Sequence, residues 1–258
     1  MLLFFDIDGT IWDYKNYIPK SAITAIKKAQ ENGHKCLINT GRARAFVKEQ
    51  NLLDIGFDGI VSACGCMVEL DNKVVFNHLI SIPDCIRTIE TIRRHGFRTI
   101  LEGPNYLYMD LSEFQGDMYA SKVIAEMGDQ LLGITDQWGQ WEINKLSCAC
   151  DTPTRDACFA ELSDLYDYMI HSEAVVEIVP KGFHKGTGIL EVCKILNVDV
   201  KDTIAFGDSA NDIPMFDTAG TSVVMGRSSE EARAHADLIT DTLEEDGIEH
   251  AMIKLGLI

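Results

Sequence analysis

The sequence predicts an α/β protein with a Rossmann-like, doubly wound parallel sheet as its core and an α+β unit inserted into that core. Two observations support this prediction. Short apolar runs alternate with amphipathic, helix-like segments over roughly the first 80 residues and again after Pro180, and such alternation builds parallel sheets with helices on both faces. Between these two stretches the strand signals lie too close together for helical crossovers, which indicates a separate unit.

The first stretch begins with the apolar run Leu2–Phe5, which predicts a buried strand. Residues 21–32 carry their apolar side chains on one helical face and are followed by Gly33, a common helix stop. The remaining elements expected here are a strand at 35–39, a helix at 43–53, a strand at 59–62 and a hairpin with strands at 67–70 and 74–77.

The inserted unit begins near Pro83, which suits the first turn of a helix that ends at Gly96. Its further elements are expected as strands at 98–102 and 106–110, a helix at 112–127, a strand at 145–150, a helix at 154–167 and a strand at 175–179. The core pattern then returns with helices at 185–196, 211–219 and 228–236, strands at 203–206, 222–225 and 238–240, and a C-terminal helix. We therefore expect a discontinuous core at 1–81 and 182–258 and an inserted domain at 82–181.

The composition is that of a globular protein with an acidic surface. The 258 residues are 46% hydrophobic and 24% charged, and the net charge is −17, so nucleic acid and anionic membranes are not expected as partners. An anionic small molecule would need local positive charge in such a protein. Basic residues close to acidic motifs are therefore of special interest. We expect a monomer or a homodimer.

The eight cysteines are scattered, and the sequence has no CxxC pair. Cys64 and Cys66, like the pair at 148 and 150, are too closely spaced for common zinc sites, and in strands this spacing places two small side chains on one face. We expect them to pack in the core. The N-terminus shows no signal-peptide pattern and no apolar run is long enough to span a bilayer, so a cytoplasmic location is expected.

Four polar segments lie where the predicted sheet would gather functional groups, at the carboxyl ends of strands. The segment Asp6-Ile7-Asp8-Gly9-Thr10 follows the first strand. The other three are Asn39-Thr40-Gly41-Arg42 after the second strand, Lys185-Gly186-Thr187-Gly188 at the start of a helix, and Gly207-Asp208-Ser209-Ala210-Asn211-Asp212 after strand 203–206. Each segment alone has an ordinary structural explanation as a turn or a cap, but together they suggest one site.

The residue types in these segments suit phosphate chemistry. One carboxylate of the first segment can attack phosphorus while the other moves a proton. Asp6, Asp8 and Asp208 would repel one another unless a cation joined them, and oxygen ligands of this kind suit Mg²⁺. Thr40 can donate to a phosphate oxygen and Lys185 supplies positive charge.

These four segments, in this order, resemble the four-motif signature of the haloacid dehalogenase-like (HAD) superfamily. The GDxxND form at 207–212 and the long insertion between the second and third segments are similar to the Cof-like branch of subclass IIB sugar phosphatases. The resemblance covers essentially the whole chain. It implies an HAD fold in which the inserted domain is a cap that sets substrate specificity.

The resemblance also implies a role for each matching residue. Asp6 corresponds to the nucleophile that becomes a phosphoaspartate, and Asp8 to the general acid and base. The implied Mg²⁺ ligands are Asp6, the main chain of Asp8 and Asp208, with Asp212 behind them, orienting Lys185 or metal-bound water. The phosphate or substrate is contacted by Gly9, Thr10, Thr40, Gly41, Lys185 and Asn211.

Two segments depart from the family pattern or leave a choice open. Ala63-Cys64-Gly65-Cys66 stands where many relatives carry Asn-Gly-Ala, which puts a substrate-facing amide in doubt. Lys181 is a second candidate for the phosphate-binding lysine, although only Lys185 begins a helix, where a cation can meet phosphate. His184 is a further candidate for the site.

The sequence thus predicts a Mg²⁺-dependent phosphatase that hydrolyses a small phosphorylated metabolite, a sugar phosphate by resemblance. Two alternatives remain open. A phosphomutase would use the same aspartates, and a non-hydrolytic phosphate-binding regulatory module would bind without turnover. A Rossmann dehydrogenase is disfavoured because the first strand is followed by DGT rather than GxGxxG.

Overall fold

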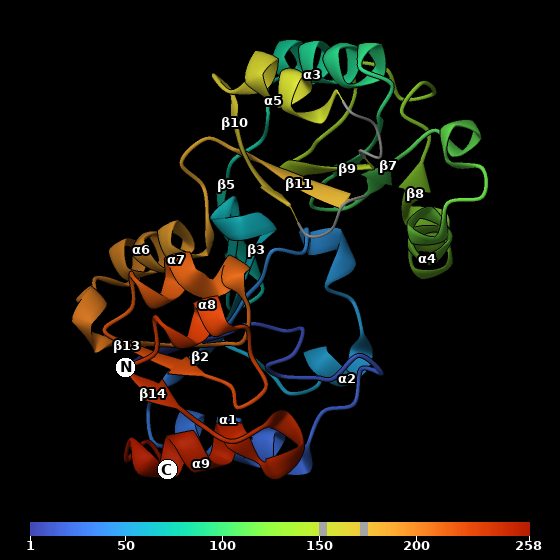
Figure 1. The fold of residues 1–258 in the computed structure, drawn as a ribbon. Coiled ribbons are helices and arrows are strands. Elements are labelled where there is room, and N and C mark those ends of the chain that lie inside the picture. The colour runs from blue at the N-terminus through green and yellow to red at the C-terminus, as the bar shows by residue number, and fades with distance from the viewer. Residues whose placement is uncertain (150–153, 171–174) are drawn as a thin grey trace. The chain divides into compact units, whose positions relative to one another are not determined.

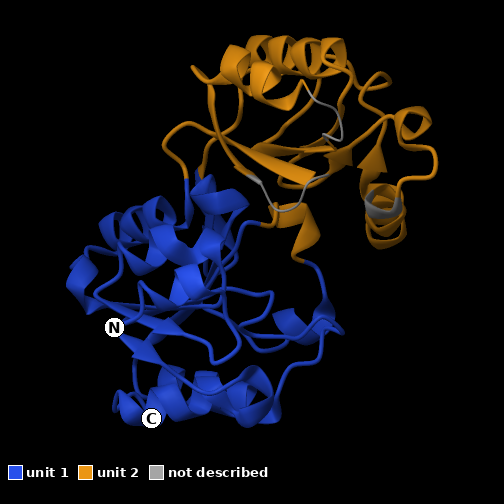
Figure 2. Ribbon diagram, viewed as in Figure 1, with its two compact units in different colours: residues 1–41, 48–76, 184–258 blue, residues 42–47, 77–183 orange. Residues whose placement is uncertain are grey.

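The computed structural model describes residues 1–149, 154–170 and 175–258. These residues form two compact units, coloured separately in Figure 2. Unit 1 consists of Met1–Gly41, Lys48–Phe76 and His184–Ile258, and unit 2 consists of Arg42–Val47 and Asn77–Phe183. Unit 1 is therefore discontinuous in sequence, with unit 2 inserted into it twice.

Unit 1 is built on one eight-stranded sheet (Figure 1). The strand order is β14-β13-β12-β1-β2-β3-β4-β5, and the pairs from β14 to β3 are parallel. The pair β3–β4 is antiparallel. The strands are β1 (Leu2–Phe5), β2 (Lys35–Asn39), β3 (Gly59–Ser62), β4 (Met67–Leu70), β5 (Lys73–Asn77), β12 (Thr203–Gly207), β13 (Thr221–Val224) and β14 (Leu238–Ile239).

Helices cover both faces of this sheet (Figure 1). One face packs in a hydrophobic cluster that joins Phe4 and Leu37 of the sheet to Ile189 of α6 and Met215 of α7; α1 and α9 lie together on the other face. The helices of unit 1 are α1 (Lys20–Glu31), α2 (Gln50–Leu53), α6 (Lys185–Leu196), α7 (Ile213–Phe216), α8 (Glu230–Arg233) and α9 (Gly247–Lys254). The predicted fold class, a doubly wound α/β core, is confirmed.

The apolar sequence of strand β1 suits its position in the middle of the sheet. All four of its side chains are buried, as expected for a strand with a parallel neighbour on each side and helices above and below. Its register pairs Phe5 with Phe206 of β12 and with Ile38 of β2. The carboxyl ends of these three strands therefore lie level, and Asp6, Asn39 and Gly207 follow at one edge of the sheet.

Unit 2 is an α+β unit with a six-stranded sheet of order β10-β11-β9-β6-β7-β8. Its helices α3 and α5 pack on one face, where Ile89 and Phe159 meet Leu146 and Ile178 in a buried cluster. The strands are β6 (Arg98–Glu102), β7 (Leu107–Tyr108), β8 (Leu131–Leu132), β9 (Lys145–Ala149), β10 (Tyr166–Ile170) and β11 (Val175–Pro180), and the helices are α3 (Ile82–Arg94), α4 (Met118–Met127) and α5 (Arg155–Leu162).

The helix predicted at 43–53 is broken. The structure has a 3₁₀ turn at Arg44–Phe46 and the short α2, with an extended Glu49 between them. The reason is tertiary. Ala45 is buried in a cluster of unit 2 and its amide donates to the carbonyl of Gly103, so the chain crosses into unit 2 and returns before α2.

Other element bounds also differ from the predictions. The helix predicted at 112–127 is a 3₁₀ turn followed by α4, because Gly116 adopts a positive φ of 79° and Asp117 then caps the helix. The helix predicted at 154–167 ends at Leu162, and β10 follows it. The last residue of the strand predicted at 145–150, Cys150, lies outside the described residues.

Candidate active site

The first motif forms a tight loop at the end of β1. Asp6 continues the strand, its amide donating to the carbonyl of Phe206 at 2.9 Å, and its side chain is buried. The amides of Ile11 and Trp12 then fold back onto the carbonyl of Ile7. The loop thereby places the buried Asp6 carboxylate at the sheet edge and the Asp8 side chain at an exposed position.

Gly9 lets this loop approach the loop after β12. It adopts a φ of +82°, which L-residues rarely adopt, and a Cβ at this position would lie 2.5 Å from Oδ2 of Asp208. The next residue completes the contact, because the Thr10 hydroxyl donates to Oδ1 of Asp208 at 3.3 Å. The first and fourth motifs thus meet through the side chain of Asp208.

Lys185, the first residue of α6, lies among the carboxylates. Its Nζ is 2.6 Å from Oδ1 of Asp6 and 2.5 Å from Oδ1 of Asp212, and its side chain is only 1% exposed. The two carboxylates raise the pKa of the Lys185 ammonium although burial opposes this. The ammonium therefore stays charged in the interior, as a buried ion pair must to be tolerated.

Asp212 holds the fourth motif together. Its Oδ2 accepts hydrogen bonds from the amides of Asp208 and Ser209 at 2.9 and 3.0 Å, while Oδ1 accepts from Lys185. Gly207 is needed for this geometry, since a Cβ there would lie 2.6 Å from the carboxyl carbon of Asp212. Asp212 thereby links the loop after β12 to the start of α6.

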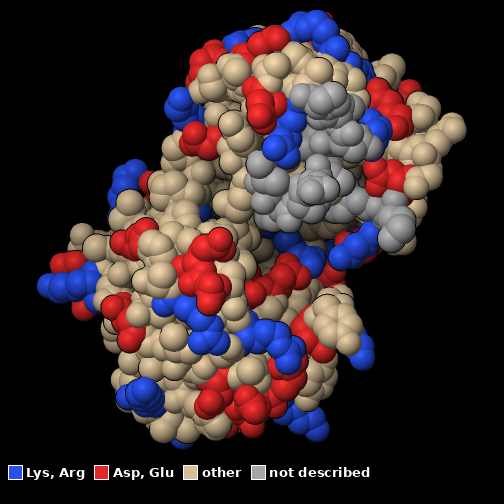
Figure 3. Space-filling view, in the orientation of Figure 1, with Lys and Arg blue, Asp and Glu red and all other residues tan. Residues whose placement is uncertain are grey.

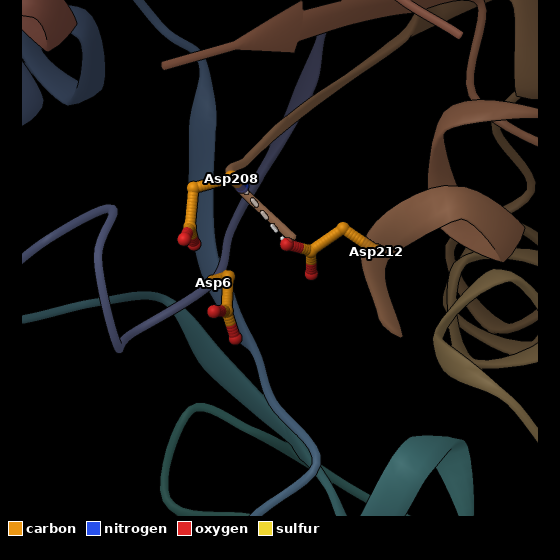
Figure 4. A group of neighbouring side chains, drawn as sticks. All are labelled: Asp6, Asp208 and Asp212. Atoms are coloured by element: carbon orange, nitrogen blue, oxygen red, sulfur yellow. Dashed lines mark hydrogen bonds between the residues drawn. The ribbon is translucent and has the colours of Figure 1, made fainter. Parts of the chain in front are cut away.

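Three carboxylates come together here, from Asp6, Asp208 and Asp212 (Figure 4). One oxygen of each lies within 4.8 Å of the others, a spacing that could hold a metal ion. Burial, helped by the charge of Asp212, raises the pKa of Asp208 to about 7, and burial also raises the pKa of Asp6 despite Lys185. Three carboxylates face one lysine here, so the oxygen donor set fits a divalent cation.

Thr40 follows β2 and is fixed by main-chain hydrogen bonds to β3 and to the turn after it. The residue is buried, its amide donates to the carbonyl of Val61 at 2.9 Å, and its carbonyl accepts from the amide of Cys64 at 3.1 Å. Cys64 belongs to a turn in which three consecutive residues have positive φ: Ala63 at 50°, Cys64 at 55° and Gly65 at 88°. Such backbone costs free energy in non-glycine residues and often marks functional sites.

Asn39 connects the Thr40 loop to Lys185, a role that was not predicted from the sequence. Its buried Nδ2 donates to the carbonyl of Lys185 at 3.0 Å. Gly65 adds a second connection, because a Cβ there would lie 2.8 Å from the backbone of both Gly188 and His184. The sequence feature that could have indicated this link is an Asn at the end of the predicted strand, directly before Thr40.

The remaining candidates fall in different places. Gly41 is buried beside Thr40, and Asn211 accepts a hydrogen bond from the Ser209 hydroxyl at 2.6 Å. The Lys181 ammonium donates to the carbonyl of Ser163 in unit 2, so Lys185 is the lysine that meets the aspartates. His184 is the N-cap of α6 and accepts from the amide of Thr187, which gives it a structural role.

All seven described cysteines are buried, in agreement with packing. Among the described residues no helix is both long and apolar enough to cross a membrane. On the face drawn in Figure 3, acidic and basic side chains are interspersed, and the basic ones do not form one extended surface there.

Comparison with known proteins places the chain in a family. The haloacid dehalogenase-like hydrolase family profile matches residues 3–252. YkrA of Bacillus subtilis, named as a candidate phosphatase, is 30% identical over 100% of this chain and 98% of its own length. A phosphoglycolate phosphatase of Methanothermobacter thermautotrophicus is 21% identical over 96% of this chain and 95% of its own.

Solved structures agree with this assignment. The HAD phosphatase BT1666 of Bacteroides thetaiotaomicron matches with a TM-score of 0.86 and 26% identity over 100% of this chain and 95% of its own. The HAD subclass IIB sugar phosphatase BT4131 has the same fold, with a TM-score of 0.84 at 24% identity over 100% and 99% of the two chains. The chain therefore belongs to the haloacid dehalogenase-like hydrolases and is an HAD-type phosphatase, as the resemblance of its motifs predicted.

Proposed function

We propose that this protein is a Mg²⁺-dependent phosphatase that hydrolyses a small phosphorylated metabolite through a phosphoaspartate on Asp6. The observation that carries the proposal is the buried Lys185 ammonium, 2.6 Å from Oδ1 of Asp6 and on the same edge of the sheet as Thr40. A cation there neutralises the approaching phosphate, and its charge opposes the burial that raises the pKa of Asp6, which favours the ionised carboxylate for attack. The exposed Asp8 supplies a second carboxylate two positions after the buried Asp6. An ion pair with a purely structural role would not need it.

The reaction we propose has two steps. In the first, a carboxylate oxygen of Asp6 forms a bond to phosphorus, the bond from phosphorus to the leaving oxygen breaks, and Asp8 gives that oxygen its proton. In the second, Asp8 takes a proton from water, the water oxygen bonds to phosphorus, and the bond to Asp6 breaks. Thr40 and Lys185 hold the phosphate oxygens in both steps. Further contacts to the phosphate or the substrate come from Gly9, Thr10, Gly41 and Asn211.

The metal-binding groups we propose are the carboxylates of Asp6 and Asp208 and the main chain of Asp8, with Asp212 behind them. The raised pKa values of Asp6 and Asp208 support this choice. When bound, Mg²⁺ supplies positive charge that screens the attacking carboxylate from the phosphate. Asp212 holds the loop and Lys185 in place through the hydrogen bonds described above.

We infer a sugar phosphate as the substrate class and unit 2 as the cap that selects it. The similarity to the sugar phosphatase BT4131 supports the sugar phosphate, and the similarity to a phosphoglycolate phosphatase supports a small phosphorylated metabolite in general. Domain bounds of 1–81 and 182–258 for the core and 82–181 for the cap are part of this proposal. Cytoplasmic location and a monomeric or homodimeric state belong to it too.

Hydrolysis of p-nitrophenyl phosphate and of a panel of phosphorylated metabolites, with and without Mg²⁺, tests the proposal. We expect release of free phosphate that requires the metal, and loss of at least about 10³-fold in kcat for Asp6→Asn with an unchanged circular dichroism spectrum. Free phosphate also distinguishes a phosphatase from a phosphomutase, which would return an isomerised ester. Full activity of Asp6→Asn would refute the role of Asp6, and binding of phosphate esters without turnover would favour a regulatory module.

A further inference from the structure

Trp12 contacts Asp8, the exposed carboxylate of the first loop. The indole is fully buried, and its Nε1–H donates to Oδ1 of Asp8 at 2.9 Å. A buried tryptophan usually directs its N–H to a hydrogen-bond partner. Here the partner is the residue to which we assign proton transfer.

The backbone fixes the position of this indole relative to Asp8. The amide of Gly9 donates to the carbonyl of Trp12 at 2.9 Å, and the amide of Trp12 donates to the carbonyl of Ile7 at 3.2 Å. A β-bridge pairs Asp8 with Trp12. Two main-chain hydrogen bonds and the side-chain hydrogen bond therefore tie Trp12 to the loop that carries Asp8.

We propose that Trp12 is a positioning residue that orients Asp8 for proton transfer, an inference that rests on the proposed function. An N–H donor at Oδ1 makes that oxygen the acceptor, so in the carboxylic acid form the proton is carried by Oδ2. The hydrogen bond also restricts rotation of the carboxyl group. Asp8 then presents its Oδ2–H in one direction, toward the leaving oxygen, instead of sampling several rotamers at an exposed position.

The effect of Trp12 on catalysis should depend on the leaving group. In the first step the bond from phosphorus to the leaving oxygen breaks as Asp6 bonds to phosphorus, and the proton on Oδ2 of Asp8 passes to that oxygen. A strongly basic leaving group needs this proton, whereas p-nitrophenolate leaves without it. Misorientation of Asp8 should therefore slow phosphoryl transfer mainly from substrates with basic leaving groups.

The experiment compares Trp12→Phe with wild type on phenyl phosphate and p-nitrophenyl phosphate, two substrates of nearly the same shape. Phenol has a pKa of about 10, like the tyrosine side chain, and p-nitrophenol is much more acidic. We expect kcat/KM to fall about tenfold for phenyl phosphate and less than about twofold for p-nitrophenyl phosphate, since kcat/KM reports the first chemical step and only phenolate needs the acid.

Trp141→Phe is the matched control. Trp141 is also buried and its Nε1–H donates to the carbonyl of Ile134 at 3.1 Å, within unit 2. Its substitution should lower the midpoint of thermal unfolding without changing the ratio of the two kcat/KM values. An equal loss on both substrates in Trp12→Phe, or no loss on either, would overturn the inference, while inactivity of the wild type would instead count against the proposed function.

A spectroscopic measurement applies if Trp12→Phe does not fold. The chain has three tryptophans, so their indole N–H signals are resolvable in a ¹⁵N-correlated NMR spectrum. In Asp8→Ala we expect the Trp12 indole signal to shift upfield and its hydrogen exchange to become faster, while the Trp141 signal stays in place. An unchanged Trp12 signal would show that the hydrogen bond is absent in solution and would refute the inference.

Discussion

Nζ of Lys185 lies 2.6 Å from Oδ1 of Asp6, although 179 positions separate the two residues in the sequence. The contact forms because α6 begins where β1 ends, and the Asn39 side chain ties the first turn of α6 to the neighbouring strand. Asp212 shares the same ammonium. One buried cation therefore joins three of the four motifs, and its removal should affect both stability and activity.

Lys185→Met should destabilise the fold strongly. It leaves Asp6 and Asp212 buried without their counter-charge, and breaking a buried ion pair from one side typically costs about 3–5 kcal/mol. The exposed Lys194 on the same helix, which pairs with Glu191, is the control, and Lys194→Met should cost less than about 1 kcal/mol. Urea unfolding without metal measures both values. A cost for Lys185→Met as small as that of the control would contradict the buried ion pair.

The stability of the metal-free protein should decrease as the pH rises through about 7. Asp208 has its pKa raised from 3.8 to about 7 by burial and by Asp212, and the pKa of Asp6 is raised as well. Between about pH 4 and pH 7 the native state therefore binds more protons than the unfolded state. The stability that protonated Asp208 gives the native state is complete below about pH 4 and is lost as the pH rises and Asp208 ionises. Thermal unfolding in EDTA between about pH 5.5 and 8 measures the slope.

Asp208→Asn and added Mg²⁺ serve as controls for this pH dependence. The substitution should flatten the slope, because the amide does not titrate. Mg²⁺ should raise the unfolding midpoint more at high pH than at low pH, since it binds the ionised carboxylates. A slope that is identical in wild type and Asp208→Asn would show that other groups cause it.

Gly9→Ala should weaken metal binding more than it weakens the fold. A methyl group at Gly9 would meet the Asp208 carboxylate at 2.5 Å, and this side chain can move aside, but then it leaves its position near Asp6. Gly56 has the same φ of +82° with nothing within 4 Å of an added Cβ. In both alanine variants, backbone strain should lower the free energy of unfolding by about 1 kcal/mol.

Only Gly9→Ala should need a higher Mg²⁺ concentration for half-maximal activity, by about tenfold for a loss of about 1.4 kcal/mol in binding. The measurement is a Mg²⁺ titration of p-nitrophenyl phosphate hydrolysis in both variants and in wild type. Equal metal requirements in Gly9→Ala and Gly56→Ala would mean that the contact with Asp208 has no influence on the metal.

The sequence was a good guide to the core because its signals are local. β1 and β2 have the predicted bounds, since a continuous apolar run followed by a polar Gly-containing loop has few other solutions in an α/β protein. The same rule placed Asp6 and Asp208 on one edge of the sheet. Phe5 and Phe206 are paired in register, and the two carboxylates follow that pair.

The features missed by sequence reasoning depend on contacts between distant segments. The break in the helix predicted at 43–53 comes from the burial of Ala45 in unit 2, which no local propensity reveals. The hydrogen bond from Trp12 to Asp8 and that from Asn39 to Lys185 need coordinates. Ala63 and Cys64 at positive φ were equally invisible, because neither residue type favours that conformation.

Phosphorylation of Asp6 can be observed in the intact mass of Asp8→Asn after mixing with p-nitrophenyl phosphate and Mg²⁺. This substrate needs no proton donor, and the variant has no base to activate water, so the phosphoenzyme should accumulate. We predict a mass increase of one phosphoryl group, located on the peptide that contains Asp6 and absent from the double variant Asp6→Asn/Asp8→Asn. If the wild type hydrolyses the substrate but Asp8→Asn shows no phosphorylated Asp6, the reaction does not proceed through a phosphoaspartate on Asp6.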